Sequence, residues 1–401
     1  MLRSKDFRRL WALGGITNAM RWLEMLAAAL FTFEATGSGI AVAFVSAARS
    51  LPLLCLGAVA GVVCEAINRK YILLGGLLLS GAAAFCICLL DLLDVVQPWH
   101  VAVAAFVSGS VWATEFASRR RMVGECAGTG FVSQAVALDS LTSAFSRMVG
   151  PLLGSMLFAW TGLLGAFAIS AGCYLAGAFL VPGINHVQEA RRLVLARIPR
   201  DLTESLAFAL KQPAVLTVLG VTATMNLFAF SYVALAAPLG RTVFGVSDAL
   251  VGLLAAGEPL GGLIGGLLLT RKTPSSNLRA LMIAGSALFL AALVAMPLMP
   301  SYGLACGTLV GGGLGLALFG NMQTTLVLTG VPAHLRSRQM GLVTMCIGLG
   351  PVGQMLIGIL SEFFGPLLAT VITASAGLAA LGGIAILCMR AAPRSGPPQP
   401  P

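Results

Sequence analysis

Residues 183–213, GINHVQEARRLVLARIPRDLTESLAFALKQP, form the longest polar interval of the chain. About 180 mostly apolar residues lie on either side of it. We interpret the interval as a cytoplasmic bridge between two membrane-embedded bundles, because a soluble linker does not join two regions of such apolar character. Within it, residues 201–210 are expected to form a short amphipathic surface helix with Asp201 as its N-cap. The basic side chains of the bridge are Arg191, Arg192, Arg197, Arg200 and Lys211.

The composition indicates that lipid is the main solvent of the chain. Of 401 residues, 58% are hydrophobic and 10% are charged, whereas about 25% of the residues of a soluble protein are charged. A formal charge of +10 would suggest nucleic acid for a soluble protein, but the loop charges described below account for it without a nucleic-acid partner. The chain has no Walker loop and no recognisable hydrolase motif, so we expect neither ATP use nor enzymatic activity, and no cofactor.

Apolar runs of about 20 residues are long enough to cross a bilayer as helices, and the chain contains twelve. The sequence therefore predicts an all-α membrane protein with twelve transmembrane helices in two six-helix halves. The halves are residues 1–182 and 214–390, joined by the bridge at 183–213, and the proline-rich tail 391–401 is expected to be disordered. The predicted spans are 10–33, 40–64, 71–93, 97–117, 134–158, 162–182, 214–239, 249–270, 279–298, 302–328, 338–360 and 366–389.

The basic residues test this map. With the N-terminus in the cytoplasm, 21 of the 25 basic residues fall in cytoplasmic segments, and only Arg241 falls outside. The remaining three, Arg21, Arg49 and Arg147, lie within spans. Because cytoplasmic loops carry an excess of Lys and Arg, this asymmetry favours twelve spans with both termini in the cytoplasm.

A charged motif occurs between the second and third spans, GVVCEAINRKYIL at residues 61–73. Gly61 allows two helices to approach, and Glu65 and Arg69 are spaced to form a charge cluster at the membrane surface. The pattern resembles the signature loop of the major facilitator superfamily, in which such a cluster latches one half onto the other. Glu65 stands where the superfamily has Asp, and Asn68 replaces a turn glycine, which Asn can do because it tolerates positive φ.

Three further segments strengthen this resemblance: DFRRLW at 6–11, GSGIAVAFVSAARSLPLL at 37–54 and RMVGPLLG at 147–154. They are similar to the bacterial exporter branch that includes the enterobactin exporter. The resemblance implies proton-coupled efflux of small organic molecules. We expect a bacterial inner-membrane protein that acts as a monomer.

Charges inside the predicted spans are candidates for function, since each costs roughly 3 kcal/mol or more in a bilayer. Arg21 and Glu24 lie three residues apart on one helix face, with Asn18 one turn earlier. Either they form a self-neutralising pair that aids packing, or they form a proton or substrate site. We expect Glu24 to carry the coupling proton, because the resemblance places the first span on the central cavity. Arg49 has no evident partner.

Arg147 in the fifth span and Glu258 in the eighth both fall near the midplane, by a rise of about 1.5 Å per residue. The resemblance places these spans opposite each other, which predicts a salt bridge between the halves. Glu258 is then the competing proton carrier. Asp139 is expected to form a gate with Arg271 or Lys272.

Neutral polar residues are sparse in the spans. Asn226 and Gln323 lie in spans that the resemblance places on the cavity, so they are candidates for substrate binding, although hydrogen bonds between helices explain them equally well. Glu115 and Arg119 are expected to form an ordinary local pair. No cluster of His, Cys and Asp crosses a predicted span, so the sequence indicates no metal site.

The leading interpretation is a secondary transporter that exports a small molecule in exchange for protons, by rocking two halves about a central site. A metal- or siderophore-related carrier and an uptake transporter are alternatives. A transporter-like sensor or assembly partner is a further alternative, although a scaffold has no need for Arg21, Glu24 and Glu258.

Overall fold

The computed structural model describes residues 4–126, 132–184, 198–271, 277–332 and 335–391, although some side chains within these ranges, including those of Glu65 and Arg271, are not described. Every regular element in these ranges is a helix. The elements are α1 (Lys5–Thr36), α2 (Gly39–Ala66), α3 (Arg69–Leu92), α4 (Pro98–Cys126), α5 (Val132–Leu180), α6 (Ile198–Lys211), α7 (Pro213–Thr224), η2 (Met225–Ala229), η3 (Phe230–Leu235), α8 (Ala236–Pro238), η4 (Leu239–Val243), α9 (Asp248–Arg271), α10 (Leu278–Ala295), η5 (Met296–Leu298), α11 (Tyr302–Gly330), α12 (Arg336–Ile347) and α13 (Gly350–Ala391).

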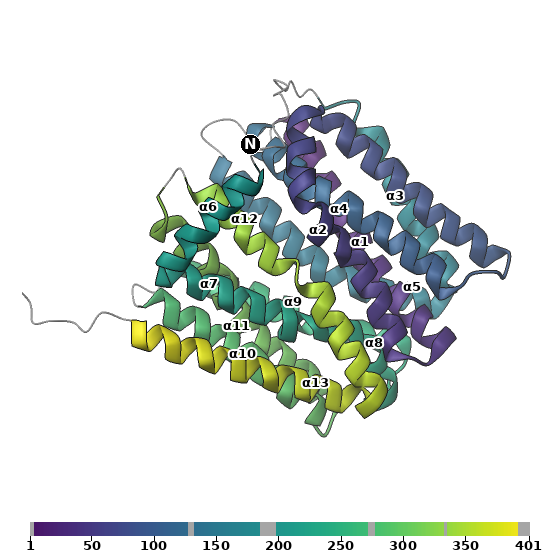
Figure 1. The fold of residues 1–401 in the computed structure, drawn as a ribbon. Coiled ribbons are helices and arrows are strands. Elements are labelled where there is room, and N and C mark those ends of the chain that lie inside the picture. The colour runs from purple at the N-terminus through teal and green to yellow at the C-terminus, as the bar shows by residue number, and fades with distance from the viewer. Residues whose placement is uncertain (1–3, 127–131, 185–197, 272–276, 333–334, 392–401) are drawn as a thin grey trace, which may run out of the picture.

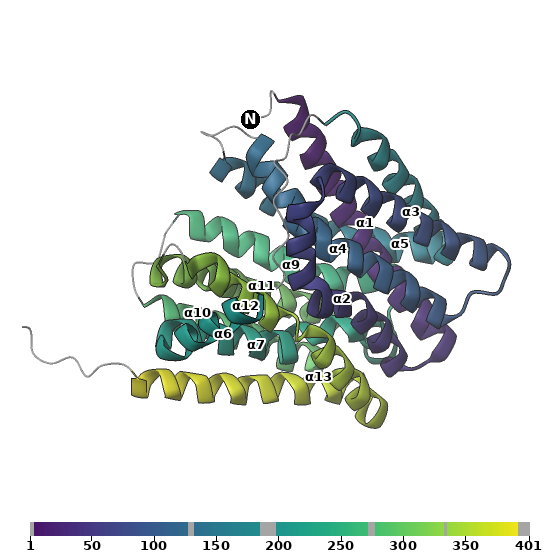
Figure 2. The same ribbon diagram turned by 45° about the horizontal axis from the view of Figure 1, so that its top comes forward.

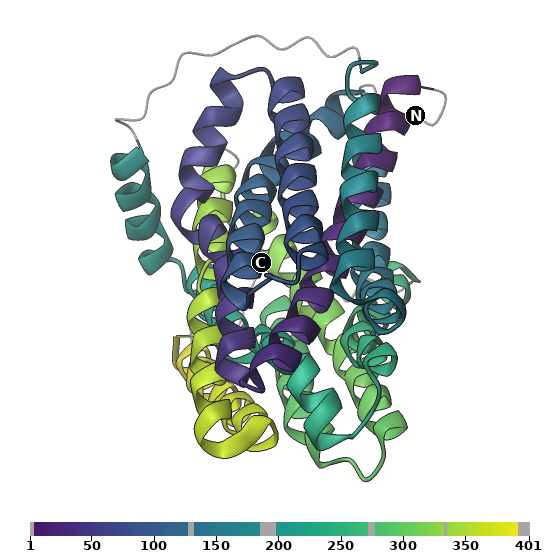
Figure 3. The same cartoon turned by 90° about the vertical axis from the view of Figure 1, so that its right-hand side faces the viewer.

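Seven helical stretches of the described chain are long and apolar enough to cross a membrane. Figure 3 shows that most helices run along one common direction, as membrane-spanning helices do. Two of the seven stretches, Leu138–Leu180 and Gln339–Leu387, contain 43 and 49 residues. At 1.5 Å per residue each is about twice the length that the hydrocarbon core of a bilayer requires.

Both of these long stretches reverse direction at a glycine. In α5 the chain turns at Gly162 (φ 65°), and in α13 it turns at Gly365 (φ 79°); positive φ values such as these favour glycine. The packing confirms the first reversal, because Ser146 donates to the carbonyl of Gly15 while Gly177, thirty-one residues later, packs against Leu13. Both arms of α5 therefore lie beside the same turn of α1.

Most limits of the predicted spans agree with the helices to within about five residues, but α4 continues to Cys126, well beyond the predicted limit at 117. Two local details also differ. The bridge helix α6 begins at Ile198 instead of Asp201, so Asp201 is not its N-cap. Pro199 accounts for the earlier start, because proline is favoured in the first turn of a helix. Asn68 has φ −59°, not a positive value, and its side chain caps α3 by accepting from the Lys70 amide. The predicted tail lies outside the described residues from 392 onward.

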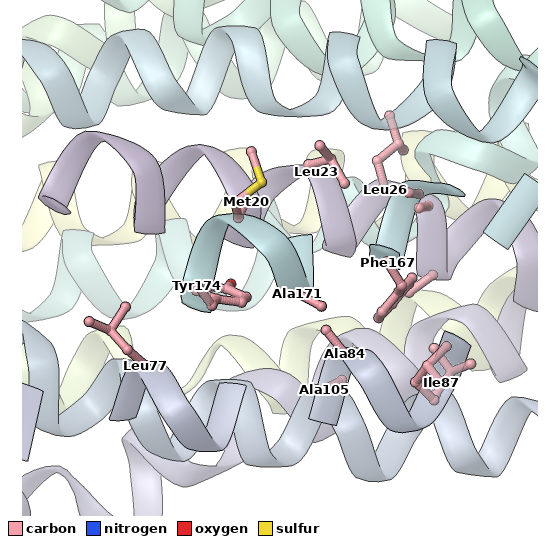
Figure 4. Packing of buried hydrophobic residues seen from close by; sticks show 14 of the residues in the cluster. Met20, Leu23, Leu26, Leu77, Ala84, Ile87, Ala105, Phe167, Ala171 and Tyr174 are labelled. Carbon is pink, nitrogen blue, oxygen red and sulfur yellow. The ribbon is translucent and has the colours of Figure 1, made fainter. Parts of the chain in front are cut away.

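The buried hydrophobic side chains form two clusters. One contains residues between Phe7 and Ile184, with three additions from α8 and α9. The other contains residues between Ala209 and Leu381, with Ala43 added from α2. In Figure 1 the purple-to-blue helices α1–α5, the first bundle, lie to the upper right, and the green-to-yellow helices α7–α13, the second bundle, lie to the lower left. Figure 4 shows the first cluster, where Met20 and Leu23 of α1 lie near Tyr174 and Ala171 of α5.

Two helix pairs join the bundles, α5 with α9 and α2 with α13. Gly252 of α9 packs against Pro151 and Ser155 of α5, and Gly358 of α13 packs against Ala43 of α2. Hydrogen bonds tie the bundles at the end of the molecule where α1 meets α2: Ser38 donates to Glu362 (2.9 Å), and Arg241 donates to Glu34 (3.3 Å). In Figure 2 the first bundle again lies toward the upper right and the second toward the lower left, and the two overlap around α2 and α9.

Candidate functional site

A central cavity lies between the two bundles. It has two adjoining lobes of about 430 and 380 Å³, which is the size range of sites for small organic molecules. The lobes share a wall of cationic, aromatic and polar side chains. That shared wall consists of Asn18, Arg21, Trp22, Trp112, Arg147, Phe230, Pro259 and Phe319.

Arg21 forms its ion pair with α4 and not with Glu24. Its Nη2 lies 2.6 Å from Glu115 Oε2, and its Nη1 donates to Asn18 Oδ1 at 2.9 Å. The guanidinium also lies over the Trp112 ring, 5.5 Å from the centroid. The expectation that Arg21 and Glu24 neutralise each other is thus wrong, because a carboxylate on a neighbouring helix approaches the guanidinium more favourably than one three residues away on the same helix.

Glu115 and Arg119 form the local pair expected from their spacing, with 3.4 Å between Nε and Oε1. The pair belongs to a larger network, since Glu115 also accepts from Thr17 at 2.9 Å and from Arg21. Arg119 binds Asp139 of α5 at 2.5 Å. Asp139 is therefore held inside the first bundle instead of reaching toward the second, and its two expected partners, Arg271 and Lys272, have side chains outside the described part.

Arg147 and Glu258 form the ion pair predicted between the halves. Arg147 comes from α5 and Glu258 from α9, so the contact crosses from one bundle to the other. The second carboxylate oxygen of Glu258 accepts from the Tyr232 hydroxyl at 3.2 Å. The Glu258 side chain is 4% exposed, whereas that of Arg147 is 31% exposed. The arginine therefore faces the cavity, and the carboxylate lies behind it.

Glu24 does not line the central cavity. It is buried inside the first bundle, where Arg49 of α2 and Tyr174 of α5 face it. The reason given above for preferring Glu24 as the proton carrier, direct contact with substrate in the cavity, does not hold. α1 does line the cavity, but with the face that carries Asn18, Arg21 and Trp22.

Asn226 and Gln323 both line the cavity, and both are bonded to the same threonine of α7. Asn226 donates to the Thr222 carbonyl at 2.9 Å, and Gln323 donates to the Thr222 hydroxyl at 2.6 Å. Only Gln323 bonds to another helix, since the Asn226 bond is to a carbonyl one turn earlier in its own helical stretch. Cavity lining and helix–helix bonding therefore occur together at Gln323.

The motif between α2 and α3 is only partly described. Arg69 is buried as the first residue of α3. Gly61 lies within α2, while the side chain of Glu65 lies outside the described part. The latch proposed for these residues stays a prediction.

Sequence reasoning missed Trp22, Trp112 and Tyr232 as site residues. A tyrosine in an apolar span is itself a signal, because its buried hydroxyl requires a hydrogen-bond partner. Trp22 follows Arg21 directly, and its ring lies 5.9 Å from Arg147 Cζ. The position of Trp22 directly after an intramembrane arginine could therefore have marked it as a candidate site residue.

Helices packed about a central cavity are the arrangement expected from the resemblance to the major facilitator superfamily, and solved transporter structures match this fold over nearly the whole chain. A bacterial homologue of the human lysosomal transporter Spinster, in an inward-facing and occupied conformation, superimposes with a TM-score of 0.76 at 15% identity, covering 97% of both chains. The nucleoside transporter NupG superimposes with a TM-score of 0.71 at 14% identity, covering 96% of this chain and 99% of that one.

Within this superfamily the chain belongs to the transmembrane secretion effector family, whose model matches residues 1–395. It is 26% identical over 388 residues to the uncharacterised transporter YfiS of Bacillus subtilis, covering 91% of this chain and 89% of YfiS. It is 24% identical over 371 residues to the multidrug efflux pump Tap of Mycolicibacterium fortuitum, covering 88% of each. The chain is a major facilitator transporter protein, and the superfamily resemblance is confirmed.

Proposed function

We propose that this protein is a secondary active transporter that exports a small organic molecule in exchange for protons. The observation that carries the proposal is a drug-sized cavity between two bundles, with one ion pair, Arg147–Glu258, crossing it. A charge pair at such a place can hold the bundles together in one state and be replaced by substrate or proton in another. Similarity to an efflux pump favours export over uptake.

The proposal includes twelve spans in two halves. The reversals at Gly162 and Gly365 divide two of the seven long stretches into two arms each. α1, α2 and α4 are each long enough to cross, with 32, 28 and 29 residues. Those three helices, the four arms and the five other long stretches together make twelve. The two hydrophobic clusters support boundaries near 182 and 214.

The proposed orientation places both termini in the cytoplasm of a bacterium, in the inner membrane. The basic residues of the bridge support it. In a variant without other reactive cysteines, Cys at exposed Ser247 is expected to react with an impermeant maleimide from outside intact cells, and Cys at exposed Asn277 is not. Labelling at both positions, or the reverse pattern, would contradict the twelve-span map.

Glu258 is the better-placed proton carrier of the two candidates. Its partner lies on the other bundle, so rocking separates the pair, and it lines the same cavity as the substrate. Protonation of Glu258 and binding of a cationic substrate then compete for one carboxylate, which is the requirement for exchange. Arg21 and Asn18 serve on the wall of the cavity, with Asn226 and Gln323 opposite. Arg69, Glu65, Gly61 and Asp139 are proposed to act in gating.

Everted vesicles provide the test. With an acid lumen, vesicles that contain the protein are expected to accumulate ethidium, an aromatic cation, and to lose it when an ionophore collapses the pH difference. Fluorescein, an aromatic anion, tests the opposite charge class. Glu258→Gln should retain exchange of the probe and lose its accumulation. The matched control is Asp94→Asn, which removes an exposed carboxylate after α3 that lines neither lobe of the cavity.

Three outcomes would contradict the proposal. Exchange of both probes without a response to the pH difference would remove proton coupling. Accumulation only in right-side-out vesicles would make the protein an uptake carrier. Binding of a probe without exchange would favour the sensor or assembly-partner alternative.

A further inference from the structure

A small chamber lies inside the first bundle, apart from the two lobes of the central cavity. Its volume is about 10 Å³, which is room for a single water molecule. Four of the residues around it are polar: Glu24 of α1, Arg49 of α2, Ser80 of α3 and Ser108 of α4. The remainder of the wall is apolar, and Figure 4 shows three of these residues, Ala84, Ala105 and Phe167, near one another.

The two charged groups of the chamber each have an atom without a protein partner. Glu24 Oε1 and Arg49 Nη2 are fully buried atoms that make no hydrogen bond in the described part of the protein. Both residues are 6% exposed. Because a buried charged group without hydrogen bonds is costly, a site of this kind calls for an ordered water. The chamber has the size for one, and two serine hydroxyls to complete its hydrogen bonds.

Charged and titratable groups surround Glu24 on several helices, including the Cys88 thiol of α3. Arg49 faces it from α2, and Arg21 is the other nearby cation, on α1 itself. Ser170 and Tyr174 face it from α5. Arg21 is already bound to Glu115, so Arg49 is the cation whose position decides the charge balance of Glu24.

Arg49 lies on the boundary between the two compartments. It lines the chamber together with Glu24, and it also lines the central cavity, which Glu24 does not. Its backbone is fixed, because Gly109 of α4 packs so closely that an added Cβ would lie 1.9 Å from the Arg49 carbonyl oxygen. The guanidinium can therefore change sides only by rotating its own side-chain bonds.

We propose that the chamber is a one-water proton-binding site at Glu24, separate from the substrate cavity, and that Arg49 is the positioning residue that connects the two. With the guanidinium facing the chamber, Glu24 is stabilised as a carboxylate. With the guanidinium turned to the cavity, a proton from cavity water passes through the chamber water to the carboxylate. One negative charge is then lost inside the bundle, and Arg49 presents an uncompensated positive charge to the cavity.

This inference deepens the proposed function by naming a proton site that substrate does not touch. It rests on that function only for the use made of the proton, since protonation itself is a property of the resting protein. The site is additional to Glu258, where proton and substrate compete directly, because a group that binds Arg49 influences Glu24 at a distance.

Infrared difference spectroscopy of the purified full chain, titrated with acid, tests the proposal directly. We expect a band from a protonated carboxyl group that is lost in Glu24→Gln and retained in Glu24→Asp. Arg49→Gln should move the midpoint of that band to higher pH by about one unit or more, because it removes the cation that favours the carboxylate. Arg49→Lys should keep the midpoint close to that of the unmodified protein.

Two further variants separate the chamber from general structural effects. Ala105→Val adds methyl groups to the wall of the chamber and should displace the water, which slows or abolishes the acid-induced band. Asp94→Asn, at an exposed carboxylate after α3, should leave the band unchanged. Melting temperatures identify any variant that is simply misfolded.

An unchanged spectrum in folded Glu24→Gln would overturn the site. An unchanged midpoint in Arg49→Gln would overturn the role of Arg49. Because the spectrum needs no transport, a normal titration with failed transport would count against the proposed function and leave this inference in place. Normal proton-driven transport without a Glu24 band would overturn this inference and leave the proposed function in place.

Discussion

Of the charged side chains that are buried in the described residues, seven belong to the first bundle and one, Glu258, belongs to the second. The first bundle connects its charges internally, through Arg21, Glu115, Arg119 and Asp139. The second bundle offers the cavity neutral groups, such as the Thr222, Asn226 and Gln323 cluster. Glu258, the buried acid of the second bundle, forms its ion pair with Arg147 of the first bundle.

This difference indicates what relative motion of the bundles does to each. Among the contacts between described residues, the network of the first bundle draws its groups from α1, α4 and α5, so we expect it to stay intact when the bundles separate. Glu258, in contrast, keeps only the Tyr232 hydroxyl once Arg147 withdraws. The electrostatic cost of motion is therefore concentrated at one carboxylate.

The largest expected effect concerns stability. Glu115→Gln should destabilise the protein by about 3 kcal/mol or more, because two buried arginines share that carboxylate and lose it together. Glu258→Gln should cost roughly 1–2 kcal/mol, since Arg147 is partly exposed and water can solvate it. The melting temperatures of the two purified variants show which substitution destabilises the protein more. Equal losses, or a larger loss for Glu258→Gln, would show that the second bundle depends on charge as much as the first.

A smaller effect tests whether Arg147 and Glu258 act as a pair in transport. Each single change to Ala should reduce ethidium accumulation, and the double variant should recover part of the loss. We expect a coupling energy of about 1–2 kcal/mol, as residues in contact show. The measurement is the initial rate of ethidium accumulation, at equal protein content, for the unmodified protein, the two single variants and the double variant. Strictly additive losses would mean that the contact has no part in the cycle.

Most of the fold followed from the sequence, because apolar runs and loop charges are local signals. Most limits of the spans agree with the helices to within about five residues, and the end of α4 at Cys126 is the largest difference. The family assignment from the loop motif at 61–73 also held. The short local features were less predictable: the start of α6 and the conformation of Asn68 depend on which of several acceptable caps the chain adopts.

The charge partners were predictable only where the fold family supplied the geometry. Arg147–Glu258 followed from knowing which spans face each other. Arg21 was assigned to Glu24 because the two are close in sequence, and that assignment left Arg49 without a carboxylate. Helix spacing alone cannot show that Glu115 of another helix satisfies Arg21 and releases Glu24 toward Arg49. An intramembrane arginine without an evident partner was the signal that the first assignment was incomplete.

One stretch of the second bundle changes its winding several times within a single crossing. Between α7 and the start of α9, two five-residue π-helical segments, η2 and η4, flank the six-residue 3₁₀ segment η3, with one short α-helical turn in between. A 3₁₀ helix rises about 2.0 Å per residue and an α-helix about 1.5 Å, so rewinding η3 as α-helix would shorten this crossing by about 3 Å. Phe230 of the cavity wall and Tyr232, the neutral partner of Glu258, both belong to η3. The six residues of η3 thus affect both the length of this crossing and the surroundings of Glu258 on the neighbouring helix α9.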